Sequence, residues 1–151
     1  LQDHLELGNL DSLRDWGYAK DYVECMWLIL QQDRPDDYVI ATGETRTIRD
    51  FATCAFKEAG FDIVFKGKGV KEIGVDKKSG KTLIKVNPKF FRPAEVDLLQ
   101  GNPSKAEKVL KWKRTISFED LVKRMVKNDI SLSLGEYNSH NISFLILFLL
   151  I

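Results

Sequence analysis

Cysteine and histidine are scarce in this sequence. Two of each occur among 151 residues: Cys25 and Cys54 lie within apolar helical patterns, and His4 and His140 lie near the two ends. Their spacing matches no zinc site and no paired-cysteine redox motif, so we expect buried thiols in a reducing compartment and no metal. An excess of charge of either sign is also lacking. The formal net charge of +1 gives no electrostatic case for binding nucleic acid or a membrane surface.

The common cofactor-binding and catalytic motifs are missing as well. A dinucleotide-binding loop places its glycines between a strand and a helix. Gly67, Gly69 and Gly74 have another spacing, and no helical pattern follows them. No Walker loop occurs, and no Tyr is followed four residues later by Lys, which excludes a local tyrosine base with a lysine neighbour. We therefore expect no catalytic residue within this chain.

Long apolar runs are absent except at the C-terminus. Residues 142–151 are almost entirely apolar, but a bilayer span needs about 20 such residues, so no membrane partner is expected. The run fits a packed strand, a truncated span, or sequence read through from outside the coding region. The polar, aperiodic stretch before it favours the third. The N-terminus has neither Met nor a signal pattern, so we expect the sequence to begin inside a longer protein.

What is present is a pattern of alternating helices and strands, typical of an α/β fold. Helical periodicity predicts helices over residues 19–32, 48–59 and 103–110, and from residue 118 to about 126. Capping boxes are expected at Thr47 and Ser117, and a left-handed glycine at Gly60. Short β-branched and aromatic runs predict strands at 38–41, 63–65 and 82–86, and the lysine- and glycine-rich run 66–81 predicts a solvated loop or hairpin. The first helix should have one apolar face, formed by Ala19, Val23, Met26, Trp27 and Leu30.

Two arginines are candidates for binding a phosphorylated ligand. Arg14 precedes the first helix, and Arg92 precedes Pro93, which restricts its backbone. A guanidinium group presents a planar fork of donors that suits phosphate oxygens, so two of them would bind a diphosphate. Glu95 would accept hydrogen bonds from ribose hydroxyls or a base edge. Composition alone favours ordinary surface ion pairs, of Arg14 with Asp15 or Asp21 and of Arg92 with Glu95 or Asp97.

Several runs of this sequence resemble segments of the GDP-mannose 4,6-dehydratase family. They are Leu7 to Glu24, Asp37 to Glu44, Phe90 to Asp97, Leu99 to Ala106, Trp112-Lys113 and Ser117 to Val122. The resemblance covers about Leu7 to Ile130. An Arg-Asp and an Arg-Pro segment occur across extended short-chain dehydrogenases, whereas the full runs are more specific to the GDP-mannose branch.

The resemblance implies the chemistry of a whole enzyme that is longer than this chain. That enzyme would bind NADP in an N-terminal Rossmann half and convert GDP-mannose to GDP-4-keto-6-deoxymannose, a precursor of GDP-fucose. Its Tyr-Lys pair, with Thr and Glu partners, would lie upstream. This polypeptide would then be a C-terminal fragment that is inactive alone, from a cytoplasmic protein that assembles as a homo-oligomer.

The resemblance also assigns roles within the fragment. It implies that Arg14, Arg92 and Glu95 bind substrate, and it adds Asn9 and Lys20, for which a turn asparagine and a solvated lysine are equally good explanations. The fold class is the C-terminal portion of a Rossmann-type extended short-chain dehydrogenase. Residues 1–46 would complete the cofactor-binding sheet, 47–130 would form the small GDP-sugar-binding domain, and 131–151 match nothing in the family. Alone, the first segment would lose the parallel strands that cover it.

Two other functions fit the same residues. One is a non-catalytic module that binds nucleotide sugars as a separate polypeptide. The other is an epimerase, reductase or other dehydratase of the same superfamily, which would share the arginine pair. An epimerase or reductase would lack the upstream catalytic Glu, so the sequence upstream would distinguish it.

Overall fold

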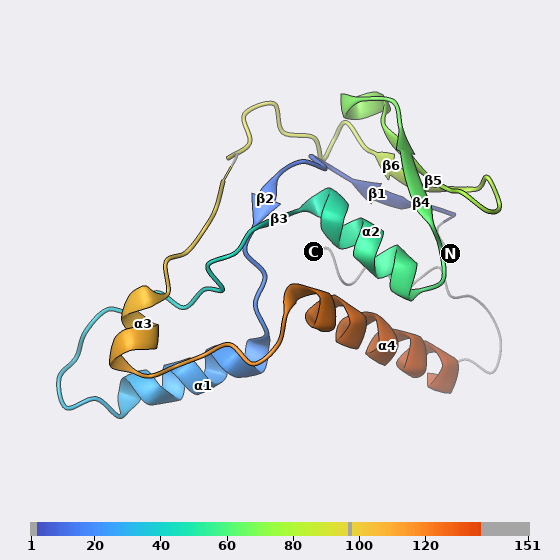
Figure 1. Cartoon of the computed structure of the whole chain (residues 1–151). Helices are drawn as coiled ribbons and strands as arrows, with labels where there is room; N and C mark the ends of the chain where they lie inside the picture. The colour runs from blue at the N-terminus through green and yellow to red at the C-terminus, as the bar shows by residue number, and fades with distance from the viewer. Residues whose placement is uncertain (1–2, 97, 137–151) are drawn as a thin grey trace.

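The computed structural model describes residues 3–96 and 98–136, which form a mixed sheet with helices on one side (Figure 1). The sheet contains β1 (Leu5–Leu7), β6 (Thr82–Val86), β5 (Ile73–Asp76) and β4 (Ile63–Lys66), in that order. β1 pairs with β6 in parallel, and the other neighbours are antiparallel. A two-stranded ribbon joins β2 (Leu13–Arg14) to β3 (Arg46–Thr47). The larger sheet therefore combines residues from both sides of position 46.

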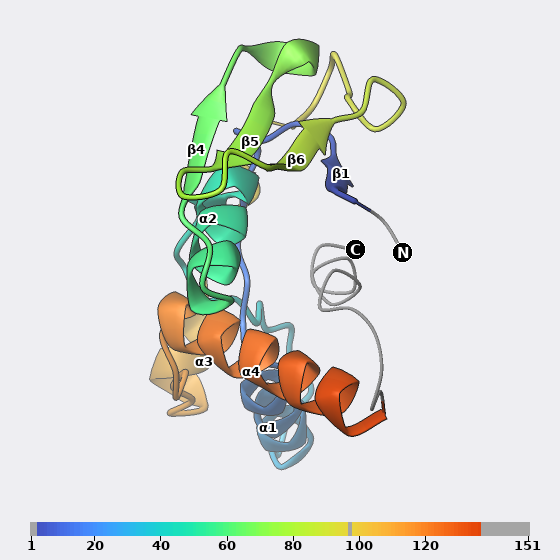
Figure 2. The same cartoon turned by 90° about the vertical axis from the view of Figure 1, so that its right-hand side faces the viewer.

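Helix α2 (Ile48–Glu58) is the central element of the core. Ala52 and Phe56 pack on the sheet against Ile84, while Phe51 and Ala55 face α4 (Phe118–Glu136) and contact Val122. All of these side chains are at most 4% exposed. Figure 2 shows the resulting layers, with the sheet, α2 and α4 following one another. Apolar burial on both sides fixes α2 between its neighbours.

Both ends of α2 are formed by the signals predicted from the sequence. The Thr47 side chain accepts from the Asp50 backbone N–H, and Asp50 accepts from the Thr47 N–H, so the capping box is confirmed. Gly60 has a φ of 90°. The backbone N–H of Gly60 donates to Lys57 O and that of Phe61 to Phe56 O, which is the Schellman pattern of a helix C-terminus.

The lysine-rich run 66–81 forms the predicted hairpin, although the sequence did not give the bounds of the strand within it. After β4 the chain forms a single 3-10 turn (Gly69–Lys71), then β5, then a tight turn into β6. Asp76 closes this turn by accepting from the backbone N–H and hydroxyl of Ser79. The bounds of β5 escaped prediction because Gly74 interrupts its apolar residues. That glycine is required, since a Cβ there would lie 2.9 Å from Ile84 Cβ.

Helix α1 (Ala19–Leu30) confirms the predicted helix, but its predicted apolar face is turned outward. Val23, Met26, Trp27 and Leu30 are 54–80% exposed. The opposite face places Cys25 in a third cluster with Trp112 and with Ala106 of α3 (Ser104–Val109).

The predicted strand at 38–41 is wrong. Residues 35–42 form no strand, and none of the described strands pairs with them. Tyr38 and Ile40 still pack beneath α1, whereas Val39 is 53% exposed. The β-branched and aromatic run predicted a buried strand, but a strand also requires a neighbouring strand to bond with.

The remaining elements differ from prediction at their ends. Helix α3 begins one residue later than expected, although Asn102 still accepts from the Ser104 N–H. Helix α4 continues to Glu136, six residues into the segment expected to be aperiodic. The apolar run 142–151 and His140 lie outside the described residues. No helix in the described part has the length and apolar character needed to span a membrane.

Candidate functional site

Arg14 and Arg92 meet at one carboxylate, that of Glu95. Arg14 lies at the end of β2, and Arg92 and Glu95 lie on the loop after β6. Arg14 Nη2 donates to Glu95 Oε1 at 2.8 Å, and Arg92 Nη1 lies 4.0 Å from Glu95 Oε2. The Arg14 and Glu95 side chains are 26% and 16% exposed, and Arg92 is 75% exposed. The structure thus brings together two guanidinium groups that are 78 positions apart in the sequence.

The Arg14 side chain also bonds to two backbone carbonyl groups. Arg14 Nη1 donates to Leu13 O at 2.8 Å and to Val96 O at 3.4 Å. Leu13 also forms a parallel bridge with Leu98. These contacts join β2 to the loop that carries Arg92 and Glu95. Arg14 and this loop therefore hold each other in position.

The ion pairs expected of Arg14 as a plain surface residue are absent from the described contacts. Asp15 instead accepts from the backbone N–H groups of Thr42 and Gly43 and from the Thr42 hydroxyl. Asp21 accepts from the backbone N–H and hydroxyl of Thr115. Both carboxylates are occupied in fixing loops, which leaves Arg14 to Glu95.

The other two predicted residues differ in their placement. Asn9 lies directly after β1 and bonds to the backbone of Arg92, so it belongs to the same cluster. Lys20 lies exposed in the first turn of α1, and it makes no hydrogen bond or ion pair within the described ranges. The structure therefore brings four of the five predicted residues together, and Lys20 stays apart.

A cavity of about 220 Å³ opens beside this cluster. The residues that line it include Asn9, Asp11, Glu72, Phe91 and Glu95. Glu72, which is 9% exposed, receives two hydrogen bonds from Arg49 (2.5 and 3.2 Å), and Arg49 also donates to Asp11 at 2.8 Å. These bonds raise the pKa of Arg49, and the bond with Glu72 contributes most to that rise. The sequence did not predict this group of Asp11, Arg49 and Glu72, because the three residues come from three segments without a shared motif.

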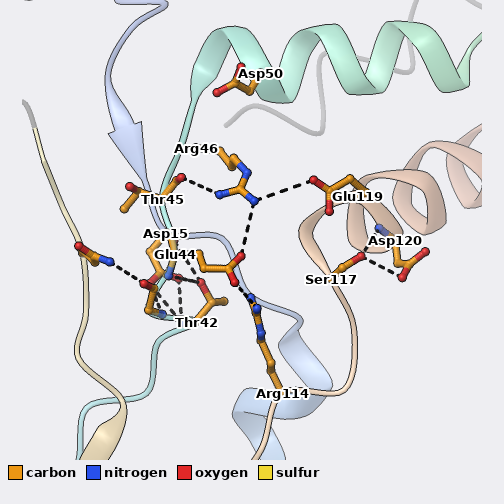
Figure 3. Close-up of polar contacts among 12 residues, drawn as sticks. Asp15, Thr42, Glu44, Thr45, Arg46, Asp50, Arg114, Ser117, Glu119 and Asp120 are labelled. Atoms are coloured by element: carbon orange, nitrogen blue, oxygen red, sulfur yellow. Dashed lines mark hydrogen bonds and ion pairs between the residues drawn. The ribbon is translucent and has the colours of Figure 1, made fainter.

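A second ionic network fixes the loop before α2 to the start of α4 (Figure 3). Arg46 Nη2 lies 3.6 Å from Glu44 and 4.0 Å from Glu119, and Arg114 bonds to the other oxygen of Glu44. The hydrogen bond from Arg114 lowers the pKa of Glu44. All four side chains are at least 36% exposed. Solvent screens such pairs strongly, so this network orients the loop more than it stabilises the fold.

A glycine loop of the dinucleotide-binding kind does not occur within residues 3–96 and 98–136. The glycines with positive φ are Gly43, Gly60, Gly67, Gly69 and Gly80. None of them lies between a parallel strand and the start of an α-helix, the arrangement that binds pyrophosphate. Within 3–96 and 98–136 no group of three or more His, Cys, Asp or Glu side chains is placed to hold a metal ion.

The arrangement of helices and strands defines a class of protein. The chain is similar to dTDP-glucose 4,6-dehydratase from Bacillus anthracis, solved in complex with NAD, with a TM-score of 0.65 and 16% identity over 87% of this chain and 36% of that one. It is also similar to UDP-glucose 4-epimerase from Thermotoga maritima, with a TM-score of 0.62 and 19% identity over 87% and 36%. The predicted fold class, part of a Rossmann-type extended short-chain dehydrogenase, is confirmed.

Sequence comparison narrows the class to one family. The pattern of the family described as GDP-mannose 4,6 dehydratase matches residues 1–125. The chain is 55% identical to the GDP-mannose 4,6 dehydratase of Drosophila melanogaster over 130 residues, and 51% identical to that of Homo sapiens over 126 residues. The chain belongs to the GDP-mannose 4,6-dehydratase family, as its sequence predicted. These matches cover 86% and 83% of this chain but only 33% and 34% of the relatives.

Proposed function

We propose that this chain is the GDP-sugar-binding part of a GDP-mannose 4,6-dehydratase. The observation that carries the proposal is the convergence of Arg14 and Arg92 on Glu95. Two guanidinium groups beside one carboxylate suit a diphosphate, because phosphate oxygens accept the same paired N–H donors as a carboxylate does.

Glu95 has two roles in this proposal. Without ligand its single negative charge offsets part of the positive charge of the two arginines, which reduces their repulsion. With ligand, the phosphates take over part of that neutralisation, and the Glu95 oxygens become acceptors for ribose hydroxyls. Lys20 remains a predicted ligand contact. Because it lies apart from the other four residues, the ligand would have to extend to the first turn of α1 to meet it.

The remaining chemistry belongs, in our proposal, to a segment that this chain does not contain. That segment would hold NADP and supply the catalytic Tyr, Lys, Thr and Glu of the dehydration. It would cover the exposed side of α1. The complete protein would be a cytoplasmic homo-oligomer, with residues 1–46 completing the cofactor domain and 47–130 binding the sugar nucleotide.

Calorimetry with GDP-mannose tests the site. The wild-type chain should show one saturable site, and Arg92→Ala should bind GDP-mannose at least about tenfold more weakly. Asp62→Ala is a surface control, because the Asp62 side chain is 72% exposed and its one polar contact within the described residues is with Lys77, at 4.0 Å. Equal affinity of wild type and Arg92→Ala would contradict the proposal.

A turnover assay tests whether the catalytic residues lie outside this chain. The purified chain, supplied with NADP and GDP-mannose, should release no 4-keto-6-deoxy sugar. Formation of that product by the chain alone would refute the assignment of catalysis to a separate segment, whatever the outcome of the binding experiment.

A further inference from the structure

We infer that Asn9 is a positioning residue that fixes the backbone of Arg92, and that it acts on the ligand only through Arg92. The inference rests on the proposed function, since Arg92 has to contact the ligand for its position to matter. Asn9 Nδ2 donates to Arg92 O at 2.8 Å, and the Arg92 N–H donates to Asn9 Oδ1 at 2.7 Å. One side-chain amide therefore pairs with both backbone polar groups of Arg92, as a neighbouring strand would.

The residues before Arg92 are held by the N–H groups of Phe90 and Phe91, which both donate to Asn87 O, and by the packing of Phe91 on the core. From Arg92 onward the segment has fewer contacts. Pro93 and Ala94 are exposed, and Pro93 has no N–H to contribute. Within the described residues, no other hydrogen bond reaches the Arg92 backbone. At its far end the segment is held by Glu95 and Val96, through Arg14. Asn9 and Arg14 are thus the two ends of a clamp on the loop that carries Arg92.

Asn9 is itself rigidly placed between two backbone contacts. On one side Leu7 O accepts from the Asn87 N–H at 2.8 Å, which extends the β1–β6 pairing. On the other side Leu10 O accepts from the Arg49 N–H at 2.8 Å. Gly8 lets the segment after β1 approach the loop after β6 closely, because a Cβ at Gly8 would collide with the Phe90 carbonyl oxygen.

The chemistry of the amide explains why this position needs asparagine. Aspartate would keep the acceptor for the Arg92 N–H but would place an oxygen opposite Arg92 O. Alanine would remove both partners. If Asn9 turned toward a ligand instead, the Arg92 N–H and C=O would lose their bonds, and each such bond contributes to stability.

Backbone amide exchange of the 151-residue chain tests the clamp without any ligand. In Asn9→Ala, the Arg92 amide should exchange about tenfold faster than in wild type, because the acceptor of the Arg92 N–H is lost. The Phe51 amide in α2 should not change. Asn102→Ala is the matched control, since among the described residues the Asn102 side chain bonds to Ser104 alone, at the start of α3. Unchanged exchange at Arg92 in Asn9→Ala would overturn the inference.

A double-mutant cycle with GDP as the probe tests how Asn9 acts. Asn9→Ala should weaken GDP binding about tenfold in the wild-type background, and should cost nothing further in the Arg92→Ala background. The same loss in both backgrounds, or no loss in either, would overturn the positioning role, since a direct contact or a general structural effect does not depend on the Arg92 side chain. If wild type does not bind GDP at all, the proposed function fails, and the exchange experiment still decides whether Asn9 holds Arg92.

Discussion

Helices α1 and α2 have similar lengths and similarly periodic apolar residues, yet they differ in what covers them. The apolar face of α2 is buried between the sheet and α4, with Phe51 1% exposed. On α1 the corresponding residues point outward, and Trp27 is 59% exposed. Periodicity tells which side of a helix is apolar, but whether that side is covered depends on the neighbours that are present. The uncovered face of α1 is the part of the fold that requires a neighbour.

The largest effect is expected from a cavity under α2. Phe51→Ala removes a ring that packs on Trp16 and Phe118, with centroids at 5.0 and 5.7 Å. It should lower the free energy of unfolding by about 3–5 kcal/mol. Urea denaturation followed by circular dichroism measures the loss. A loss below about 1 kcal/mol would mean that α2 is no better covered than α1.

A smaller effect is expected at the cap of the same helix. Thr47→Ala removes the acceptor for the Asp50 N–H, bonded at 3.0 Å, and should cost about 1 kcal/mol. Thr47→Ser keeps the hydroxyl and is the matched control in the same denaturation experiment. Equal losses for the two variants would show that the capping box does not hold this end of α2.

The turn between β5 and β6 should respond to acid. Hydrogen bonds from the hydroxyl and N–H of Ser79 lower the pKa of Asp76 from 3.8 to about 2. Because the folded pKa is the lower one, the contribution of Asp76 is complete above pH 4 and is lost as the pH falls toward 2. Stability measured across this range should fall less in Asp76→Asn than in wild type. Parallel curves for the two proteins would contradict the assignment.

The smallest effect is expected on the outer face of α1. Trp27→Ser should change the free energy of unfolding of this chain by no more than about 0.5 kcal/mol, because the ring is largely in solvent already. The same urea series as for Phe51→Ala provides the comparison. A loss approaching that of Phe51→Ala would show that the α1 face is covered within this chain or by a second copy of it.

The sequence alone predicted the local features of the fold well. Thr47, Asp50 and Gly60 mark the ends of α2 because capping depends on neighbouring residues only. It failed at residues 38–41, where a strand was expected, because strand formation depends on a partner that no local pattern reveals. It also missed the bounds of β5, whose apolar pattern is interrupted at Gly74.

The candidate site divides in the same way. Arg14, Arg92 and Glu95 were candidates from their side-chain chemistry, and the structure brings them together. The bond between Asn9 and the backbone of Arg92 spans 83 positions, and the contact of Arg49 with Glu72 spans 23. Neither leaves a motif in the sequence, because a side chain that bonds to a distant segment needs only the right place in the fold.

The central claim is that Arg14 and Arg92 together bind two phosphates, and a comparison of GDP with GMP tests it most directly. Calorimetry should show that the wild-type chain binds GDP at least about tenfold more tightly than GMP, since each charged hydrogen bond contributes about 1.5–3 kcal/mol. Arg14→Ala should remove most of that preference. Equal affinity of the wild-type chain for GDP and GMP would contradict the account.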